Sequence, residues 1–443
     1  MENTIHLLCI LAPLIFLVDL GLRMAQGQGT PARRWKTLWT EEHWLVCDHF
    51  ALWRQRLAAP LFLGLIVIWW IWVAVENVLE LFFLPQVLAA VTVVKSLTVS
   101  ALILTKILCC TRYSYRQLLC AAAAFALFAK AYSVCGYVRV IQAMFLLLAA
   151  KDTKLVQNMQ AMLITTLISF VTRVGLSLAG YLDTMATNEN GRVRFALGYG
   201  SYNALGIAVA EMMLLYFLLR YQKLRWWDWA ALAVGAAFIQ FVPNSRGSLV
   251  LCLLVFLMAM MAKCLPKLAA KKWAAWAAAC LALVPLVTSY IILLLHGFFQ
   301  GTKLAQILER LFTGRARLAW SHIYTRGRPG LFGEPFTTQR GDLYTVDNAF
   351  VYYLYALGPI VATMLLIGSV WLVFRLARRG GADWGLAALV LGYLFYGVME
   401  RQFYPNLFTM LLCNVIYADS CSLTLHTQTK PLSHKPGSKG VTS

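Results

Sequence analysis

Arginine is the commonest charged residue in the polar segments that interrupt this apolar chain beyond residue 190. Arg194, Arg246, Arg315, Arg317 and Arg340 lie in short stretches between hydrophobic blocks. A guanidinium group offers five N–H donors in a planar fork that matches phosphate and carboxylate geometry, which a lysine ammonium does not. These residues therefore predict a binding site for an anionic group.

The first of these segments, RFALGYGSYNALG, covers residues 194–206. Gly198 and Gly200 lie where a loop enters a predicted helix, and backbone N–H groups at a helix start bind anions readily. Asn203 falls within the first turns of that apolar helix, where a polar side chain is costly unless it is paired. Arg194 and Asn203 are therefore candidate substrate-binding residues. A helix cap with glycines for close packing is the structural alternative.

The second segment, PNSRGS, is a predicted tight turn between two apolar blocks at residues 243–248. Arg246 lies at the edge of the following block, and Ser245 and Ser248 could cap its helix. We interpret Arg246 as a candidate phosphate ligand. An arginine that merely extends to the membrane surface is the alternative.

Two further segments could move a proton. On a helix, Arg315, Ala319 and His322 of TGRARLAWSHIY share one face, because residues four and seven apart are neighbours. His322 is a candidate general base, or a structural histidine. Asp347 and Asn348 precede an apolar block, where either could cap a helix. Asp347 is the preferred candidate base, and Asn348 a candidate substrate ligand.

The usual signatures of nucleotide, metal and covalent chemistry are absent from the sequence. P-loops, GxGxxG and HExxH motifs, nucleophile elbows and DxD-like acidic pairs do not occur. The eleven cysteines are scattered and form no CxxC pattern, so neither a disulfide framework nor a zinc site is implied. We therefore expect no metal and no cofactor, and arginine is left to neutralise a phosphate group.

The amino-acid composition indicates the fold class that must position these residues. The 443-residue chain is 60% hydrophobic and 13% charged, with a mean hydropathy of +0.67. A soluble domain has about 25% charged residues, so soluble enzymes, secreted disulfide scaffolds and disordered chains are excluded. The net charge of +20 does not indicate nucleic-acid binding, because the basic residues lie mainly between apolar blocks. The composition predicts an all-α, polytopic transmembrane helix bundle.

Hydrophobic blocks predict about 13 spans, since roughly 20 apolar residues cross a bilayer. They lie near residues 6–22, 59–82, 86–109, 117–133, 135–150, 157–181, 196–219, 227–242, 247–263, 273–296, 347–374, 384–399 and 404–418. We divide the chain into an N-terminal span with a basic cytoplasmic segment (1–58), a membrane domain (59–418) and a cytoplasmic tail predicted to be disordered (419–443). Residues 298–346 form one long predicted extracytoplasmic loop, which contains a short amphipathic helix.

Loop charges predict the orientation. One set of alternating loops, with the tail, contains most of the lysines and arginines and is assigned to the cytoplasm by the positive-inside rule. Ten of the eleven basic residues in the opposite loops are arginine. Orientation needs only positive charge, so this selection of arginine favours anion recognition on the outer face.

The segments, in this order and at these predicted positions, resemble the Wzy-type polysaccharide polymerases of the bacterial O-antigen ligase and polymerase superfamily. The matching residues are Arg194-x-x-x-Gly198-x-Gly200-x-x-Asn203, Ser245-Arg246-Gly247, Gly314-Arg315, Leu331-Phe332-Gly333, and Asp347-Asn348 with Gly358, together with KDTK at 151–154. The resemblance covers roughly residues 85–418. Ser-Tyr precedes Asn203 where the family pattern has His-Pro.

The resemblance implies a multi-pass protein of the bacterial cytoplasmic membrane and a metal-independent, inverting glycosyltransferase. Its substrates would be undecaprenyl-pyrophosphate-linked oligosaccharide repeat units, which it joins into a surface polysaccharide such as O-antigen or capsule on the outer face. Partners would be the lipid bilayer, a flippase and a chain-length regulator, and no nucleic acid. The arginines would stabilise the pyrophosphate leaving group.

Two alternatives remain open. An O-antigen-type ligase would transfer the finished chain to another acceptor, and the motifs do not separate it from a polymerase. A lipid-linked oligosaccharide flippase or transporter would explain charged residues inside the spans. These are Glu76, Glu80, Lys95, Lys106, Arg173 and Glu211, which could also pair among themselves.

Overall fold

The computed structural model describes the chain in segments. These are residues 18, 21–25, 30–44, 56–69, 71, 85–136, 139–184, 187–189, 192–311, 314–335, 346–400 and 407–417. Within them, seven helices are long and apolar enough to cross a membrane. The chain is thus helical, as predicted, apart from two pairs of very short antiparallel strands, β1–β2 and β3–β4.

The described elements follow one another along the chain in the order below. They are α2 (Pro31–Thr40), β1 (His43–Trp44), an unlabelled helix (Arg56–Trp69), α4 (Pro85–Cys110), β2 (Arg112–Tyr113), α5 (Tyr115–Cys135), α6 (Arg139–Ala149), α7 (Leu155–Leu178), β3 (Thr187–Glu189), β4 (Arg192–Arg194), α8 (Tyr202–Arg220), a 3₁₀ turn (Tyr221–Lys223), α9 (Trp226–Phe241), α10 (Arg246–Cys264), α11 (Pro266–Ala269), α12 (Lys272–Leu281), α13 (Val284–Phe298), α14 (Lys303–Leu311), α15 (Arg315–Arg326), α16 (Ala349–Arg379), α17 (Asp383–Tyr396) and α18 (Leu407–Tyr417).

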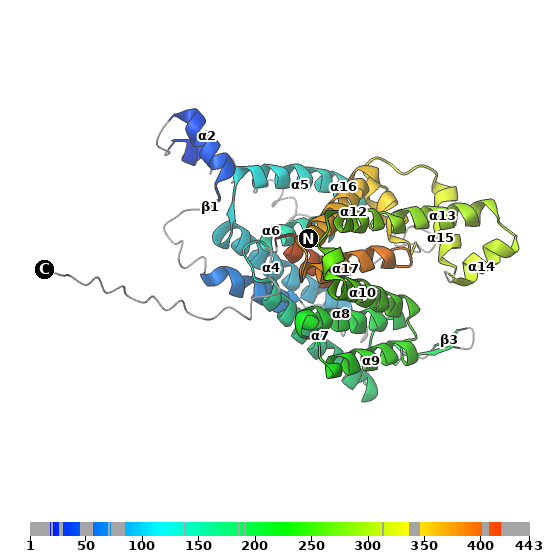
Figure 1. The fold of residues 1–443 in the computed structure, drawn as a ribbon. Coiled ribbons are helices and arrows are strands. Elements are labelled where there is room, and N and C mark those ends of the chain that lie inside the picture. The colour runs from blue at the N-terminus through cyan, green and yellow to red at the C-terminus, as the bar shows by residue number, and fades with distance from the viewer. Residues whose placement is uncertain are drawn as a thin grey trace.

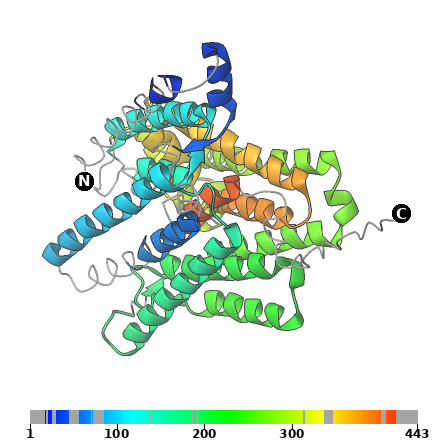
Figure 2. The same cartoon turned by 90° about the vertical axis from the view of Figure 1, so that its left-hand side faces the viewer.

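The long helices run side by side, so that the connections collect at two ends (Figure 1). We call the end with α14, α15 and β3 the loop end, and the end with α2 and β1 the opposite end. α2 lies at the margin of the opposite end (Figure 2). The helices α8, α10, α15 and α16 all begin at the loop end. A helix start carries partial positive charge and unsatisfied N–H donors, so this end is suited to an anion.

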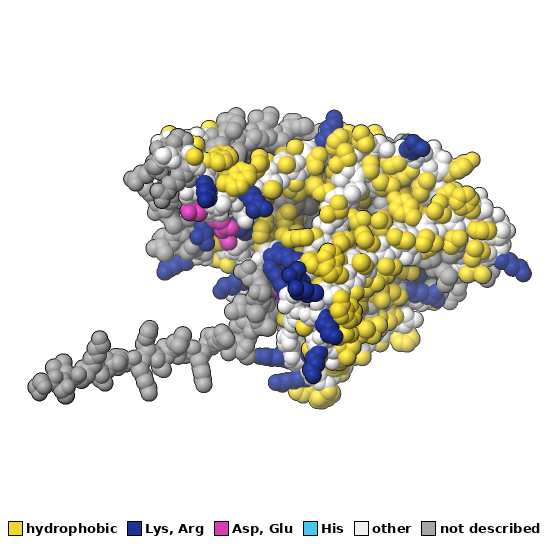
Figure 3. Space-filling view, turned by 45° about the horizontal axis from the view of Figure 1, so that its top comes forward, with side chains coloured by type: hydrophobic (Ala, Val, Ile, Leu, Met, Phe, Trp, Pro, Cys, Tyr) yellow, Lys and Arg dark blue, Asp and Glu magenta, His cyan; other side chains and the backbone are white. Residues whose placement is uncertain are grey.

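The exterior has the distribution expected of a membrane protein. In Figure 3, hydrophobic side chains cover most of the right half of the view, whereas basic side chains gather near its middle and left, with a few at the top and right edges. Large apolar residues such as Val171, Leu257 and Ile367, in the middle of α7, α10 and α16, are exposed. An apolar surface of this extent would be a liability in water, and it is compatible with a protein that lies in a membrane.

Several predicted spans are shorter than a bilayer requires. α6 and α18 have 11 residues each, and α17 has 14. The block at 6–22 lies almost wholly outside the described residues, and the block at 59–82 is described only over residues 56–69 and 71. The total of 13 spans and the outer position of the loop 298–346 therefore stay predictions.

Helix α17 forms the centre of the bundle. Twelve of its 14 residues are buried, including Leu386, Val390 and Tyr396. A helix that is apolar on every side belongs in a protein interior. It packs against α10 and α16. Its last residue, Tyr396, lies at the loop end, and the turn that follows places Glu400 there.

Candidate functional site

Arg315 lies between two carboxylates at the loop end. Its Nε donates to Asp347 Oδ2 at 3.3 Å, and its Nη2 donates to Glu400 Oε1 at 2.5 Å. The Arg315 side chain is 17% exposed, Asp347 34% and Glu400 10%. The guanidinium is therefore held in a fixed direction while one face of the group stays accessible. We call Arg315, Asp347, Glu400 and Asn203 the arginine cluster.

Asn203 completes the arginine cluster from the first turn of α8. Its Nδ2 donates to Glu400 Oε1 at 3.2 Å. α8 begins one residue earlier, after Ser201 caps it by accepting a hydrogen bond from the Ala204 N–H. The predicted start near residue 196 was thus several residues too early, because the Gly198–Gly200 stretch is a turn. A polar side chain within an apolar helix is costly unless it is paired, and Asn203 is paired with Glu400.

The start of α16 is fixed by Asn348. Its Oδ1 accepts hydrogen bonds from the N–H groups of Phe350 and Val351. Its Nδ2 donates to Ser289 Oγ at 3.0 Å and to the Val398 carbonyl at 3.1 Å. Asn348 is therefore the helix cap, one of the two roles that its sequence position allowed. Its neighbour Asp347 is left to face Arg315.

The start of α10 packs closely on two neighbouring helices. A Cβ on Gly206 of α8 would lie 2.4 Å from Ser245 Cβ, and one on Gly247 would lie 3.2 Å from the Tyr396 ring. Ser245 is at the N-cap position of α10, but its hydroxyl bonds to Ser248 at 3.0 Å and not to the helix backbone. Arg246, the first residue of α10, is exposed at this end.

Arg194 is the last residue of β4, eight residues before α8 begins. Its guanidinium stacks on the Tyr202 ring at 4.2 Å, next in sequence to Asn203. The loop between Arg194 and α8 approaches α7 closely, because a Cβ on Gly198 would lie 2.8 Å from the Arg173 carbonyl oxygen. Gly198 also has a φ of +77°, which favours glycine. The loop thereby brings Arg194 toward the same end as the arginine cluster.

The remaining predicted arginines are placed differently. Arg317 forms an ion pair with Glu309 of α14 at 3.1 Å, and its side chain is 65% exposed. Two residues along a helix turn the side chain by about 200°, so Arg317 points away from the arginine cluster. Arg340 lies outside the described residues.

His322 is buried two helical turns beyond Arg315. The two residues share a face with Ala319, as the spacing predicted, and Ala319 and His322 are both buried. The imidazole packs edge-on against the Tyr355 ring with 4.7 Å between centroids. Tyr355 in turn donates to the Gly327 carbonyl. This environment suits a packing role at the junction of α15 and α16.

The LFG segment at residues 331–333 docks onto a kink in α16. Gly358 interrupts the helical backbone at φ +77° and precedes Pro359. A Cβ on Gly358 would lie 2.2 Å from the Leu331 carbonyl oxygen, and one on Gly333 would lie 2.3 Å from the Ala356 carbonyl oxygen. Backbone contacts backbone here, so both positions require glycine. This contact fixes α15 relative to α16.

Replacing Gly358 by alanine is expected to destabilise this junction. Both the positive φ and the missing space oppose a Cβ, so we expect a loss of about 2–4 kcal/mol. Gly368→Ala on the same helix is the matched control, because nothing lies within 4 Å of its Cβ position. Thermal unfolding of the purified protein in detergent compares the two variants. Equal midpoints would contradict the docking described.

Glu400 is the member of the arginine cluster that sequence reasoning did not select. It directly follows the predicted span 384–399, and an acidic residue at that boundary was the available signal. Of the charged residues within predicted spans, Glu76 and Glu80 lie outside the described residues, and three others contact aromatic, hydroxyl or carbonyl groups. Arg173 stacks on the Tyr199 ring at 4.7 Å, Glu211 accepts from the Tyr393 hydroxyl at 3.2 Å, and Lys106 donates to Thr111 and to the Lys151 carbonyl.

The arrangement can bind an anion beside a carboxylate. The two ion-pair contacts use two of the five guanidinium donors of Arg315, which leaves donors for a further ligand. Asp347 is the more exposed carboxylate and can accept a proton from a neutral ligand. Over the described segments, no group of three or more His, Cys, Asp and Glu side chains is arranged to hold a metal ion.

No family model, curated protein or solved structure is detectably similar to this chain.

Proposed function

We propose that this protein is a membrane-embedded, metal-independent glycosyltransferase of the bacterial cytoplasmic membrane. It joins undecaprenyl-pyrophosphate-linked oligosaccharide repeat units into a surface polysaccharide on the outer face. The observation that carries the proposal is the arginine cluster, in which Arg315 is oriented by Asp347 and Glu400 where several helices begin. The sequence resemblance described above supplies the substrate class.

The proposed reaction needs two groups on either side of an anomeric carbon. A sugar hydroxyl of the acceptor unit attacks that carbon, and the bond to the pyrophosphate oxygen breaks with inversion. The hydroxyl proton passes to the Asp347 carboxylate, and the electron pair of the broken bond stays on the departing lipid pyrophosphate. Attack and departure take place on opposite sides of the carbon. Asp347, which contacts Arg315 Nε, would therefore serve the acceptor, while Arg194, Arg246 and the Arg315 donors directed away from Asp347 would serve the leaving group.

The leaving group is the part that the cations stabilise. Negative charge grows on the pyrophosphate in the transition state, and preorganised donors lower the energy of that state. In this proposal Arg315 is the central donor. Arg194 contributes from the end of β4, where it stacks on Tyr202 of α8, and Arg246 contributes from the start of α10. The N-termini of these helices add favourable partial charge. Arg317 is omitted, because its side chain faces Glu309.

The glycan that accumulates in a deletion strain tests the proposal. A polymerase defect leaves single repeat units on the acceptor that normally receives the long chains. Long chains retained on undecaprenyl pyrophosphate would instead indicate the ligase. Repeat units retained in the cytoplasm would indicate a flippase or transporter. Complementation with the wild-type gene must restore the original chain-length distribution in a gel of the surface polysaccharide.

A further inference from the structure

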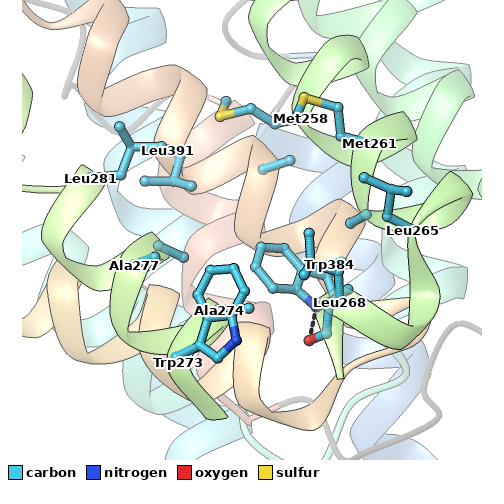
Figure 4. Close-up of a pocket in the computed structure, with 14 residues that line it drawn as sticks. Met258, Met261, Leu265, Leu268, Trp273, Ala274, Ala277, Leu281, Trp384 and Leu391 are labelled. Atoms are coloured by element: carbon cyan, nitrogen blue, oxygen red, sulfur yellow. Dashed lines mark hydrogen bonds between the residues drawn. The ribbon is translucent and has the colours of Figure 1, made fainter. Parts of the chain in front are cut away.

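A second candidate site lies at the opposite end of the bundle. It is a cavity of about 370 Å³ between α10, α11, α12 and α17, within the usual range of ligand sites. The fourteen lining residues are all hydrophobic, and alanine is the commonest (Figure 4). Met258 and Met261 lie toward one side of it, and Trp273 and Trp384 toward the other (Figure 4).

The cavity opens at the apolar exterior of the bundle, and none of its lining residues belongs to the arginine cluster. Met261, Leu265 and Trp273 on its rim are each about half exposed. Trp384 Nε1 donates to the Ala269 carbonyl at 3.2 Å, drawn as a dashed line in Figure 4, and this bond ties α11 to α17 across the cavity. Its apolar lining suits a hydrocarbon chain and offers nothing to a sugar or a soluble ion.

The segment that closes the cavity is strongly basic. Lys267, Lys271 and Lys272 lie in and beside α11 and are exposed. No Asp or Glu occurs in the sequence between Asp228 and Glu309. The nearby Asp383 on α17 is buried and lies 3.8 Å from Arg379, so it does not offset the three lysines. The cavity therefore has an apolar interior and a cationic edge.

We propose that this cavity binds one anionic phospholipid. An acyl chain occupies the space between α10, α12 and α17, and the phosphate of the headgroup lies against Lys267, Lys271 and Lys272. Basic pockets between helices on the positively charged side of a membrane protein are suited to anionic headgroups. Tryptophan at the position of Trp273 fits the boundary between acyl chains and headgroups. The bound lipid would stabilise the position of α11, at the end of the bundle opposite the arginine cluster.

Lipid retention by the purified full-length protein tests this proposal independently of any enzymatic activity. Native mass spectrometry in a mild detergent would compare added phosphatidylglycerol with phosphatidylcholine of the same acyl chains. We expect one phosphatidylglycerol to be retained at least tenfold more tightly, since each lysine near an anionic group contributes about a factor of five. Equal retention of the two lipids would overturn the proposal.

Two pairs of variants locate the bound lipid. The triple change Lys267→Gln, Lys271→Gln and Lys272→Gln should remove the preference for phosphatidylglycerol. The matched control changes Lys36, Lys154 and Lys223 to Gln, which are exposed lysines of the same end, and should keep it. Ala277→Phe, which fills the cavity, should abolish retention, whereas Ala233→Phe on the exposed face of α9 should not. Unchanged retention in Ala277→Phe would place the lipid elsewhere and contradict the assignment.

Discussion

Arg315→Lys is expected to lower polymer production about 100-fold while the protein still inserts and folds. Lysine keeps the positive charge but cannot hold Asp347 and Glu400 through two separate nitrogens and still present donors to a phosphate. The measurement is the chain-length distribution of the surface polysaccharide in a deletion strain that carries the variant gene. Immunoblotting of membranes shows whether the variant is present at wild-type level.

Arg317→Lys is the matched control for that change. Arg317 lies two residues away on the same helix, but its side chain is largely exposed and pairs with Glu309. Exposed ion pairs contribute little to stability, so the variant should produce the wild-type distribution. If Arg317→Lys lost as much polymer as Arg315→Lys, general sensitivity of α15 would explain both results. If Arg315→Lys made full-length polymer, the proposed phosphate clamp would be wrong.

Arg246→Lys extends the same test to the start of α10. Arg246 is exposed, and within the described segments no carboxylate forms an ion pair with it. In the proposed clamp it acts on the outer part of the pyrophosphate. We therefore expect a smaller loss than for Arg315→Lys, about 10-fold, in the same gel assay. Wild-type polymer from this variant would remove Arg246 from the clamp and leave the arginine cluster intact.

Hydropathy predicted the long helices because each has apolar residues over its whole length, whether these pack inside the protein or lie on its exterior. It could not separate a short core helix from a membrane span, since both are simply apolar. α17 illustrates this, because its 14 residues are too few to cross a bilayer and nearly all are buried by protein. Likewise, the block at 347–374 contains the Gly358 kink, which hydropathy does not register.

Periodicity predicted part of the candidate site for a physical reason. The spacing of Arg315, Ala319 and His322 places them on one face of any helix. In the structure they lie on one helix, α15, with this spacing. The contact between Arg315 and Glu400 joins residues 85 positions apart. Such a contact depends on how α15, α16 and α17 pack. Local patterns contain no information about that packing, so Glu400 was not selected.

Asp347→Asn is expected to reduce polymerisation by 10² to 10⁴-fold, the range for loss of a positioned general base. Asparagine preserves the size of the side chain and a hydrogen-bond acceptor for Arg315, but it cannot accept the hydroxyl proton. The measurement is again the chain-length distribution of the surface polysaccharide, with single repeat units as the expected product. Wild-type polymer from Asp347→Asn would exclude Asp347 as the base.

Glu400→Gln separates the positioning of Arg315 from proton transfer. Glu400 is less exposed than Asp347, and its Oε1 accepts from both Arg315 and Asn203. Glutamine retains an acceptor there but loses the charge-assisted bond, so we expect an intermediate loss of about 10-fold. The loss should be independent of pH, because the base at Asp347 is still present. Glu309→Gln breaks the Arg317 pair instead and should leave polymerisation unchanged. A loss in Glu400→Gln as deep as in Asp347→Asn would transfer the role of base to Glu400, because the more buried carboxylate would then be the one that the reaction needs.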